Sequence, residues 1–470
     1  MTGIKSAYLT TGLVTAGLGL ACQSPPAVQP LDADSLQDPA ACRACHPDHF
    51  RAFSGSMHAY AAEDPVFRAM NAKGQRETGG ALGDFCVACH APVAVALGLT
   101  TDGLNLDEVP AHLRGVTCAF CHLADAIEGA HNNPVRMADD GVMRGGLRDP
   151  LPNTAHASKY SSLHDGSKLD SAALCGSCHD VVTPAGVHLD QTFAEWKQTV
   201  YATDDRQRGN SCVACHMPGR DGVTAEVPGV SLRRVHDHAM PGVDVALTDF
   251  PERAAQLDAV QTLLDYSLIA ELCVIEQSGG ADIELYLENV AAGHAFPSGA
   301  AQDRQVWVEV VAKAGGRTLL EVGVVNDDEP LGKDPALWLL GDVMYDENDE
   351  PTHDFWDARR VERSFLPAPT PFRPGQPDYV NTHVPRRYRI VGPPLDLVTV
   401  RVRMRAMGLE VLRELVVSGD LDPEVVSRMP TYTLAGSVLE WSPATADLRT
   451  SPLTGLMVPC VGVQAPPVAQ

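Results

Sequence analysis

The segment Cys42-Arg43-Ala44-Cys45-His46 carries a pattern, Cys-x-x-Cys-His, that recurs through the first half of this 470-residue chain. Each copy places two thiols and one imidazole within one short stretch. The four further copies are Cys86-Val87-Ala88-Cys89-His90, Cys118-Ala119-Phe120-Cys121-His122, Cys175-Gly176-Ser177-Cys178-His179 and Cys212-Val213-Ala214-Cys215-His216. Five copies among 13 Cys and 17 His are far more than chance produces. The pattern therefore indicates one shared chemistry at five places.

Cys-x-x-Cys-His is the attachment signature of a c-type haem. The two thiols add to the haem vinyl groups, and the imidazole that follows reaches the iron from the same turn of chain. Zinc sites and disulfides are the alternatives, but zinc does not require a His directly after each second Cys. The sequence therefore predicts five covalent haems c, bound by the ten motif cysteines. The predicted proximal iron ligands are His46, His90, His122, His179 and His216.

Residues 1–21 are typical of an export signal. Lys5 gives a thin positive start, and residues 7–21 form an uncharged, largely apolar run that is short for a membrane span. Cys22 follows a site that resembles a bacterial lipoprotein cleavage site, except that Gly19 stands where Leu is usual. We expect a lipidated Cys22, with simple cleavage or an uncleaved anchor as alternatives. Residues 22–40 suit a flexible tether, and the protein is expected to be periplasmic or anchored to the outer membrane.

The chain is strongly acidic. Its 36 Lys and Arg against 60 Asp and Glu give a formal net charge of −24. This charge argues against nucleic acid and anionic lipid headgroups as partners. Solubility is the simpler interpretation, and electrostatic steering of a basic redox partner is the alternative.

Cysteine and histidine are concentrated in the first half. Ten of the 13 Cys belong to the motifs, and fourteen of the 17 His precede Pro241. Residues 22–470 also exceed what one core normally covers. We therefore expect a pentahaem cytochrome c domain of short helices and loops over residues 41–245. A haem-free domain, mainly β and sandwich-like with a few helices, is expected over residues 246–470.

The second half has the period-two pattern of strands. Ile283, Leu285 and Leu287 alternate with polar neighbours, which predicts a half-buried strand. Further strands are predicted over residues 306–311 and 398–404, a hairpin at Gly315-Gly316, a helix over residues 409–418 and another helix from Pro423. Several strands at such spacing favour a β-sandwich.

Several segments resemble bacterial multihaem cytochromes c related to the tetrahaem cytochrome that accepts electrons from hydroxylamine oxidation. The resemblance extends over most of residues 41–440. The segments that carry it are Phe53-Ser54-Gly55-Ser56-Met57-His58, Gly115-Val116-Thr117, Leu174 to Asp180, Thr192-Phe193-Ala194-Glu195-Trp196, Cys215-His216-Met217-Pro218 and Gly293-His294-Ala295-Phe296-Pro297-Ser298-Gly299. The last segment is similar to a box in longer members, which carry a haem-free β domain.

The resemblance also implies which histidines occupy the second axial position of the irons. A second His closes an iron and leaves electron transfer as its role, whereas an open iron can bind a small molecule. The expected distal ligands are His58, His131, His164, His236 and His294, with His238 as the alternative to His236 and His156 in reserve. His294 is the informative one, because it lies in the second half and would join the two domains.

The favoured function is electron transfer between redox partner proteins through closely spaced, mostly bis-His haems. No catalytic residue is assigned. The alternatives are a haem oxidoreductase with one open iron, acting on small nitrogen or sulfur compounds, and a subunit of a larger redox complex. Cys273 and Cys460 lie outside the motifs, and the sequence leaves open whether they form a disulfide or remain free thiols.

Overall fold

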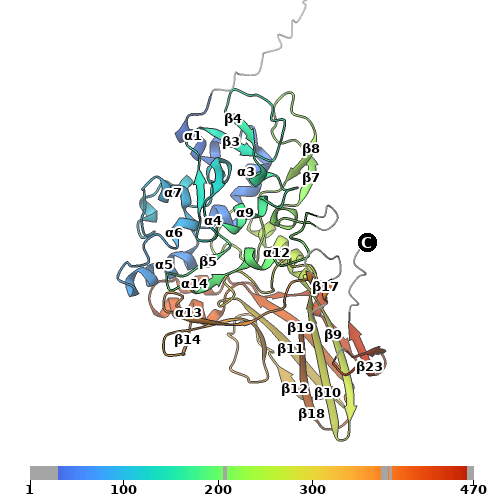
Figure 1. Ribbon diagram of the computed structural model, residues 1–470. Helices are drawn as coiled ribbons and strands as arrows, with labels where there is room; N and C mark the ends of the chain where they lie inside the picture. The colour runs from blue at the N-terminus through green and yellow to red at the C-terminus, as the bar shows by residue number, and fades with distance from the viewer. Residues whose placement is uncertain (1–29, 205–208, 372–378, 381–383, 452, 463–470) are drawn as a thin grey trace, which may run out of the picture.

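The computed structural model describes residues 30–204, 209–371, 379–380, 384–451 and 453–462. Two regions of different character follow one another along the chain (Figure 1). Short helices and loops fill the first, and long strands fill the second. The predicted export signal and Cys22 lie outside the described residues. Within the described part of the chain, no helix is both long and apolar enough to span a membrane.

The first region is built from short helices, as predicted. They are α1 (Ala33–Gln37), α2 (Pro39–Cys42), α3 (Pro47–Ser54), α4 (Met57–Tyr60), α5 (Pro65–Glu77), α6 (Val87–His90), α7 (Pro92–Ala96), α8 (Cys118–Leu123), α9 (Ser171–Gly176), α10 (Thr192–Trp196) and α11 (Cys212–His216). The side chain of Asp64 caps α5 by accepting a hydrogen bond from the Val66 amide, and Pro65 occupies the first turn of this helix.

Short strand pairs, which the sequence did not predict, close the loops between these helices. They are β1 (Ala124–Ile127) with β2 (Val135–Met137), β3 (Val142–Gly145) with β4 (Ala157–Tyr160), β5 (Val181–Val182) with β6 (His188–Asp190), and β7 (Gly219–Gly222) with β8 (Arg233–His236). The helix α12 (Arg253–Ser267) then leads directly into the first long strand.

One antiparallel sheet of the second region has the strand order β18-β10-β9-β23-β22. Its strands are β9 (Leu268–Gln277), β10 (Gly280–Asn289), β18 (Val384–Val391), β22 (Asp447–Thr450) and β23 (Met457–Gly462). The strand predicted around Ile283 is confirmed as β10, but it is buried on both faces. Glu284 is fully buried. Its carboxylate tolerates this position because it accepts hydrogen bonds from Tyr286 and Ser451 and pairs with Arg387.

The second sheet has eight strands around the central pair β11 and β19. The path is β14-β13-β11-β19-β20, and β12, β15 and β21 pair with β11, β13 and β19. The strands are β11 (Gln305–Ala314), β12 (Arg317–Val322), β13 (Trp338–Tyr345), β14 (Pro351–Thr352), β15 (Arg360–Ser364), β19 (Leu397–Arg405), β20 (Tyr432–Thr433) and β21 (Leu439–Trp441). A separate short pair joins β16 (Thr370–Pro371) to β17 (Tyr379–Val380).

The remaining predictions for the second region are confirmed. Strands β11 and β19 cover the two predicted runs, and Gly315 and Gly316 connect β11 to β12 with positive φ angles of 56° and 75°. The helices α13 (Leu409–Val417) and α14 (Pro423–Val426) lie where capping residues predicted them. The Asp422 side chain caps α14 at the Glu424 amide.

Both sheets bury side chains in one core, which makes the second region sandwich-like. Leu285 of β10, Val308 of β11 and Val400 of β19 belong to this core. Two residues of the first region, Val66 and Ala69 of α5, are buried in it as well. The two regions therefore share apolar packing in addition to the polar contacts between them.

Charged pairs also connect the regions. Arg76 of α5 binds both carboxylate oxygens of Asp420 at 2.6 and 2.7 Å. Arg304, just before β11, binds both oxygens of Asp244 at 2.6 and 2.7 Å. The Arg304 side chain is only 11% exposed, so this bidentate pair lies at the buried part of the boundary.

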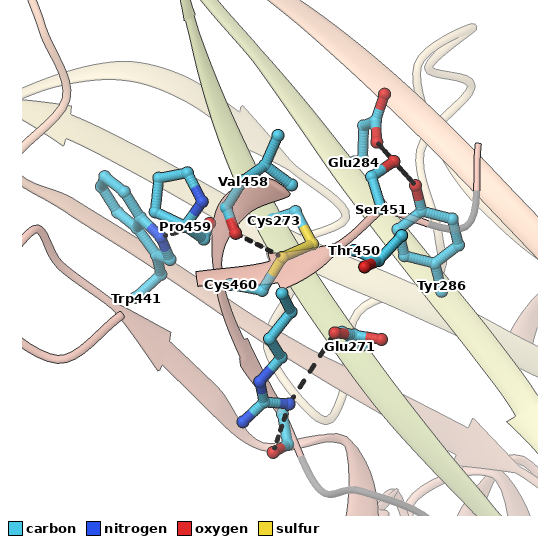
Figure 2. Close-up of a disulfide and its surroundings, with 12 residues drawn as sticks. Glu271, Cys273, Glu284, Tyr286, Trp441, Thr450, Ser451, Val458, Pro459 and Cys460 are labelled. Carbon is cyan, nitrogen blue, oxygen red and sulfur yellow. Dashed lines mark hydrogen bonds and ion pairs between the residues drawn. A yellow bond between two sulfur atoms is a disulfide. The ribbon is translucent and has the colours of Figure 1, made fainter. Parts of the chain in front are cut away.

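Cys273 and Cys460 form a disulfide, which settles the alternative that the sequence left open. The two residues face one another on β9 and β23, and both are fully buried. Figure 2 shows the neighbours of the disulfide on its two sides. Trp441, which donates to the Pro459 carbonyl, lies on one side, and the Glu284–Ser451 contact lies on the other. Glu271 lies close to both sulfurs, but disulfide sulfurs do not bind a metal ion as thiolates do.

Replacing both Cys273 and Cys460 by alanine is expected to lower the free energy of unfolding of the second region by roughly 2–5 kcal/mol, because the disulfide closes a long loop in the unfolded chain. Chemical denaturation followed by tryptophan fluorescence measures this change. The visible spectrum of the protein should stay unchanged, since β23 lies away from the helices of the first region (Figure 1). An unchanged unfolding midpoint would contradict the expectation.

Candidate haem-binding site

Each Cys-x-x-Cys-His motif forms about one turn of helix. In three motifs the amide of the His donates to the carbonyl of the first Cys, at 2.8 Å for His46, 3.4 Å for His90 and 3.0 Å for His179. The other two motifs lie within α8 and α11. One turn brings both thiols and the imidazole to neighbouring positions. This is the local geometry that attachment of one haem to both cysteines requires.

The five motifs, numbered one to five in chain order, pack against one another. Three pairs of thiols from different motifs are in hydrogen-bond contact: Cys42 with Cys118, Cys89 with Cys178, and Cys175 with Cys212. Motif one therefore lies beside motif three, and motif four lies beside both motif two and motif five. Cys121 and Cys178 also interact electrostatically, which connects motif three to motif four. The motifs thus form one continuous, branched cluster.

Four of the five proximal histidines face a second imidazole. Two imidazoles that bind one metal ion from opposite sides each place a nitrogen about 2 Å from it, so their ring centres lie about 6 Å apart. Four pairs of ring centres lie 6.3 or 6.4 Å apart: His46 and His156 at 6.3 Å, His58 and His179 at 6.3 Å, His122 and His238 at 6.4 Å, and His216 and His294 at 6.4 Å. Two other histidines lie near these proximal rings, His49 at 6.1 Å from His46 and His164 at 5.6 Å from His122. The residues present therefore fit four irons with two imidazole ligands each.

The hydrogen bonds of these rings orient them for metal binding. In six of the eight rings Nδ1 faces a backbone carbonyl oxygen: His46 with Thr224 at 2.6 Å, His122 with Arg144 at 2.5 Å, His216 with Pro241 at 2.7 Å, His156 with Ala157 at 3.2 Å, His238 with His236 at 3.0 Å, and His294 with Ala295 at 2.8 Å. A carbonyl only accepts, so Nδ1 carries the proton and Nε2 keeps a lone pair for a metal. Such bonds commonly orient metal-binding imidazoles.

Burial favours the neutral form of several of these imidazoles. It lowers the pKa of His58 and of His216 to about 4, and the pKa of His238 to about 3. Burial also lowers the pKa of His122 and of His294. A neutral imidazole is the form that binds a metal, because protonation would occupy the required nitrogen.

The segment after β8 connects three parts of this cluster. His238 faces His122 of motif three. Met240, with a positive φ of 45°, places its sulfur 3.1 Å from Nδ1 of His58. The next residue, Pro241, accepts the Nδ1 hydrogen bond of His216 in motif five. This connector therefore orients ligands of several predicted haems at once.

The structure places the predicted distal ligands in different environments. His58 and His294 face proximal histidines. His164 lies 5.6 Å from the ring centre of His122, but its Nε2 is bound to the Cys121 carbonyl at 2.7 Å and its buried Nδ1 has no partner among the described residues. His131 is exposed in its loop. His236 directs Nδ1 to the Met217 carbonyl at 2.7 Å.

Two histidines outside the predicted distal set face proximal rings. His156, kept in reserve from sequence, faces His46, and His238, the alternative to His236, faces His122. The Asn153 side chain accepts hydrogen bonds from the His156 amide and from the Ala155 amide, which fixes this loop. For His238, the sequence offered one signal, the alternation His236-Asp237-His238, in which either imidazole could face inward.

Motif two differs from the other four. His90 donates from Nδ1 to the Ala61 carbonyl at 2.9 Å, as the other proximal rings do. Its ring, however, stacks on the phenyl ring of Phe67, with centres 3.9 Å apart and planes 5° from parallel. His58 and His179 lie near enough to interact with His90 electrostatically, but within the described part of the chain no imidazole forms a ring pair with it like the other four. The residues here would thus supply one axial ligand and an apolar neighbour.

Residues 41–123, which contain the first three motifs, match the family described as cytochrome c554 and c-prime. The fold is similar to that of a penta-heme cytochrome c552 from Thermochromatium tepidum, with a TM-score of 0.59 and 19% sequence identity over 87% of this chain and 99% of that chain. No curated protein matches the chain. The family match and the shared fold support a multihaem cytochrome c that binds haem covalently and transfers electrons.

Proposed function

We propose that this protein is an exported pentahaem cytochrome c that carries electrons between redox partners through haems bound at its five motifs, four of them closed by a second histidine. The observation that carries the proposal is the set of four imidazole pairs, each about 6.3 Å apart between ring centres. Each haem, when bound, supplies one iron that changes its oxidation state by one electron. The chain supplies the attachment sulfurs, the axial nitrogens and the buried surroundings.

The proposed axial pairs explain why electron transfer is favoured over small-molecule chemistry. A second imidazole excludes water and substrate from an iron. The carbonyl partners of Nδ1 hold six of the eight rings in one orientation and increase the basicity of Nε2. The proposed distal ligands are His156 for motif one, His238 for motif three, His58 for motif four and His294 for motif five. His131, His164 and His236 then have other roles.

The packing of the motifs supports a conducting path with two exposed ends. Arg43 and Ala44 of motif one are exposed, and so are Ala214 and Cys215 of motif five. The corresponding residues of motif three, Ala119 and Phe120, and of motif four, Gly176 and Ser177, are buried. We propose that redox partner proteins approach motifs one and five, and that motifs three and four carry electrons between these two surfaces.

A second candidate function rests on motif two. Because, among the described residues, no imidazole has its ring centre about 6.3 Å from that of His90, as in the other four pairs, the iron bound there is proposed to keep an open coordination position. An open haem iron can bind and reduce a small nitrogen or sulfur compound, with electrons arriving from motif four beside it. In this interpretation the four closed haems supply electrons to the open one.

Export is part of the proposal because c-type haem is attached outside the cytoplasm. The run of apolar residues before Cys22 supports secretion, and a lipid on Cys22 would tether the protein to a membrane surface. The Pro-rich segment before α1 would then give the folded region some distance from that surface.

Replacing His58 by alanine tests the proposed axial pairs. The change removes one of the two imidazoles around the iron of motif four, so one further haem should become high-spin, in addition to the open haem proposed at motif two, while the other three keep their low-spin spectrum. Electron paramagnetic resonance of the oxidised protein measures the high-spin fraction. His188→Ala, an exposed histidine on β6, is the matched control and should change nothing. A wild-type spectrum in the His58 variant would remove this residue from the ligand set.

A further inference from the structure

A loop of the second region, residues 293–299, reaches the haem region between β10 and β11 and carries His294. Two side chains of α10 in the haem region bind it. Glu195 Oε2 accepts hydrogen bonds from the Ala295 amide at 3.1 Å and from the Ser298 hydroxyl at 2.7 Å. Thr192 Oγ1 contacts the Ser298 hydroxyl at 2.8 Å and accepts from the Gly299 amide at 3.1 Å. The loop is thus attached to α10 at both ends.

The position of Ala295 decides where the His294 imidazole lies. Its amide belongs to the peptide bond that follows His294, and its carbonyl accepts the Nδ1 hydrogen bond of the same imidazole at 2.8 Å. A contact that holds the backbone of Ala295 therefore also restrains the direction of Nε2 of His294. The loop has one further anchor within its own region, where Asn289 donates to the His294 carbonyl at 2.8 Å.

The helix that carries Glu195 is itself attached to motif four. The Phe193 amide donates to the His179 carbonyl at 3.1 Å, and the Phe193 ring packs closely against Gly176. On its other side, Glu195 Oε1 lies 3.5 Å from a guanidinium nitrogen of Arg363 in β15. The Glu195 side chain is only 16% exposed, so these partners replace water around its carboxylate.

We infer that Glu195 is a positioning residue, which reaches from the haem region to hold the His294 imidazole at the iron bound by motif five. The inference rests on the proposed function, because it requires His294 to be an axial ligand. Glu195 does not touch the iron. It acts through the Ala295 peptide and the Ser298 hydroxyl, and it ties the orientation of the motif-five ligand to the helix that follows motif four.

The competing role for Glu195 is simple stabilisation through its ion pair with Arg363, and the two roles predict different results. Glu195→Gln keeps an oxygen that accepts from the loop but removes the negative charge. Arg363→Gln removes the ion pair and leaves the loop contacts intact. Positioning requires the acceptor oxygen alone, whereas a stabilising ion pair requires both charges.

The experiment measures the high-spin fraction of the oxidised holoprotein by electron paramagnetic resonance. Glu195→Ala should raise it by up to one haem in five, Glu195→Gln should restore most of the low-spin signal, and Arg363→Gln should match the wild type. If Glu195→Ala does not mature, Glu195→Asp, whose shorter side chain cannot reach both loop partners, should show the same high-spin haem.

His294→Ala is measured in parallel. It separates the role of Glu195 from the assignment of His294 as an axial ligand. If it adds one high-spin haem while Glu195→Ala and Glu195→Asp keep the wild-type high-spin fraction, the positioning role is wrong and the ligand assignment stands. If the Gln variants of both residues resemble Glu195→Ala, the ion pair is what matters, and the inference is again overturned. If His294→Ala itself keeps the wild-type high-spin fraction, the proposed ligand is wrong and the inference fails with it.

Discussion

Replacing His294 by alanine is expected to convert one of the five haems from low-spin to high-spin while all five remain covalently attached. The physical reason is that His294 is the only histidine among the described residues whose ring forms a pair with the ring of His216. Their ring centres lie 6.4 Å apart. Attachment depends on the thiols of motif five, which the substitution does not touch. The visible spectrum and the mass under denaturing conditions measure the two parts of this prediction separately.

The same substitution should leave the two regions joined. Val245 and Leu247, next to the predicted domain boundary, are 3% and 4% exposed and belong to the core of the second region. The Arg76–Asp420 pair also connects the regions away from the loop. Limited proteolysis near residue 245 is therefore expected to accelerate only slightly. His353→Ala, a histidine of the second region paired with Asp303, serves as the control and should keep the wild-type high-spin fraction.

A His294→Ala variant whose high-spin fraction equals that of the wild type would contradict the proposed haem ligation across the boundary between the regions. The loop of residues 293–299 would then be a structural turn, and the second region would be joined to the haem region only by packing and ion pairs.

The motifs could be predicted from sequence because each one is local. Two thiols and an imidazole within a single turn need no information from the rest of the chain. The strands β11 and β19 were predictable for a similar reason, since period-two alternation reflects the local geometry of an extended chain. The Gly315-Gly316 hairpin followed from the positive φ angles that glycine adopts readily.

Two of the proposed distal imidazoles, His156 and His238, were not in the predicted set, because each comes from a distant part of the chain. His156 reaches His46 across more than a hundred residues, and His238 reaches His122 over a similar span. Nothing in the local sequence of His131 distinguishes it from these residues. Only the folded chain shows that His131 is exposed while His238 is half-buried against the cluster.

The burial of β10 on both faces was missed for a related reason. The alternation of Ile283 with Glu284 predicts a strand with one polar, exposed face. The fold instead brings Arg387 and Ser451 to Glu284, so that the carboxylate is satisfied without water. A pairing of this kind, between residues about a hundred or more positions apart, leaves no trace in the local pattern.

We propose that one iron of five is open and that the other four are closed by a second imidazole. Four proximal histidines have a second imidazole ring centre 6.3–6.4 Å away, and among the described residues His90 has no such partner. Carbon monoxide binds readily to an open ferrous haem and is excluded from one with two imidazole ligands. The open iron should therefore be the one bound at motif two.

Titration of the fully reduced protein with carbon monoxide, followed in the visible spectrum, tests this claim most directly. The number of haems per chain is established on the same preparation by mass under denaturing conditions. We expect five haems and one bound carbon monoxide per chain. Binding to none of the irons, binding to two or more, or fewer than five haems in fully matured protein would contradict it.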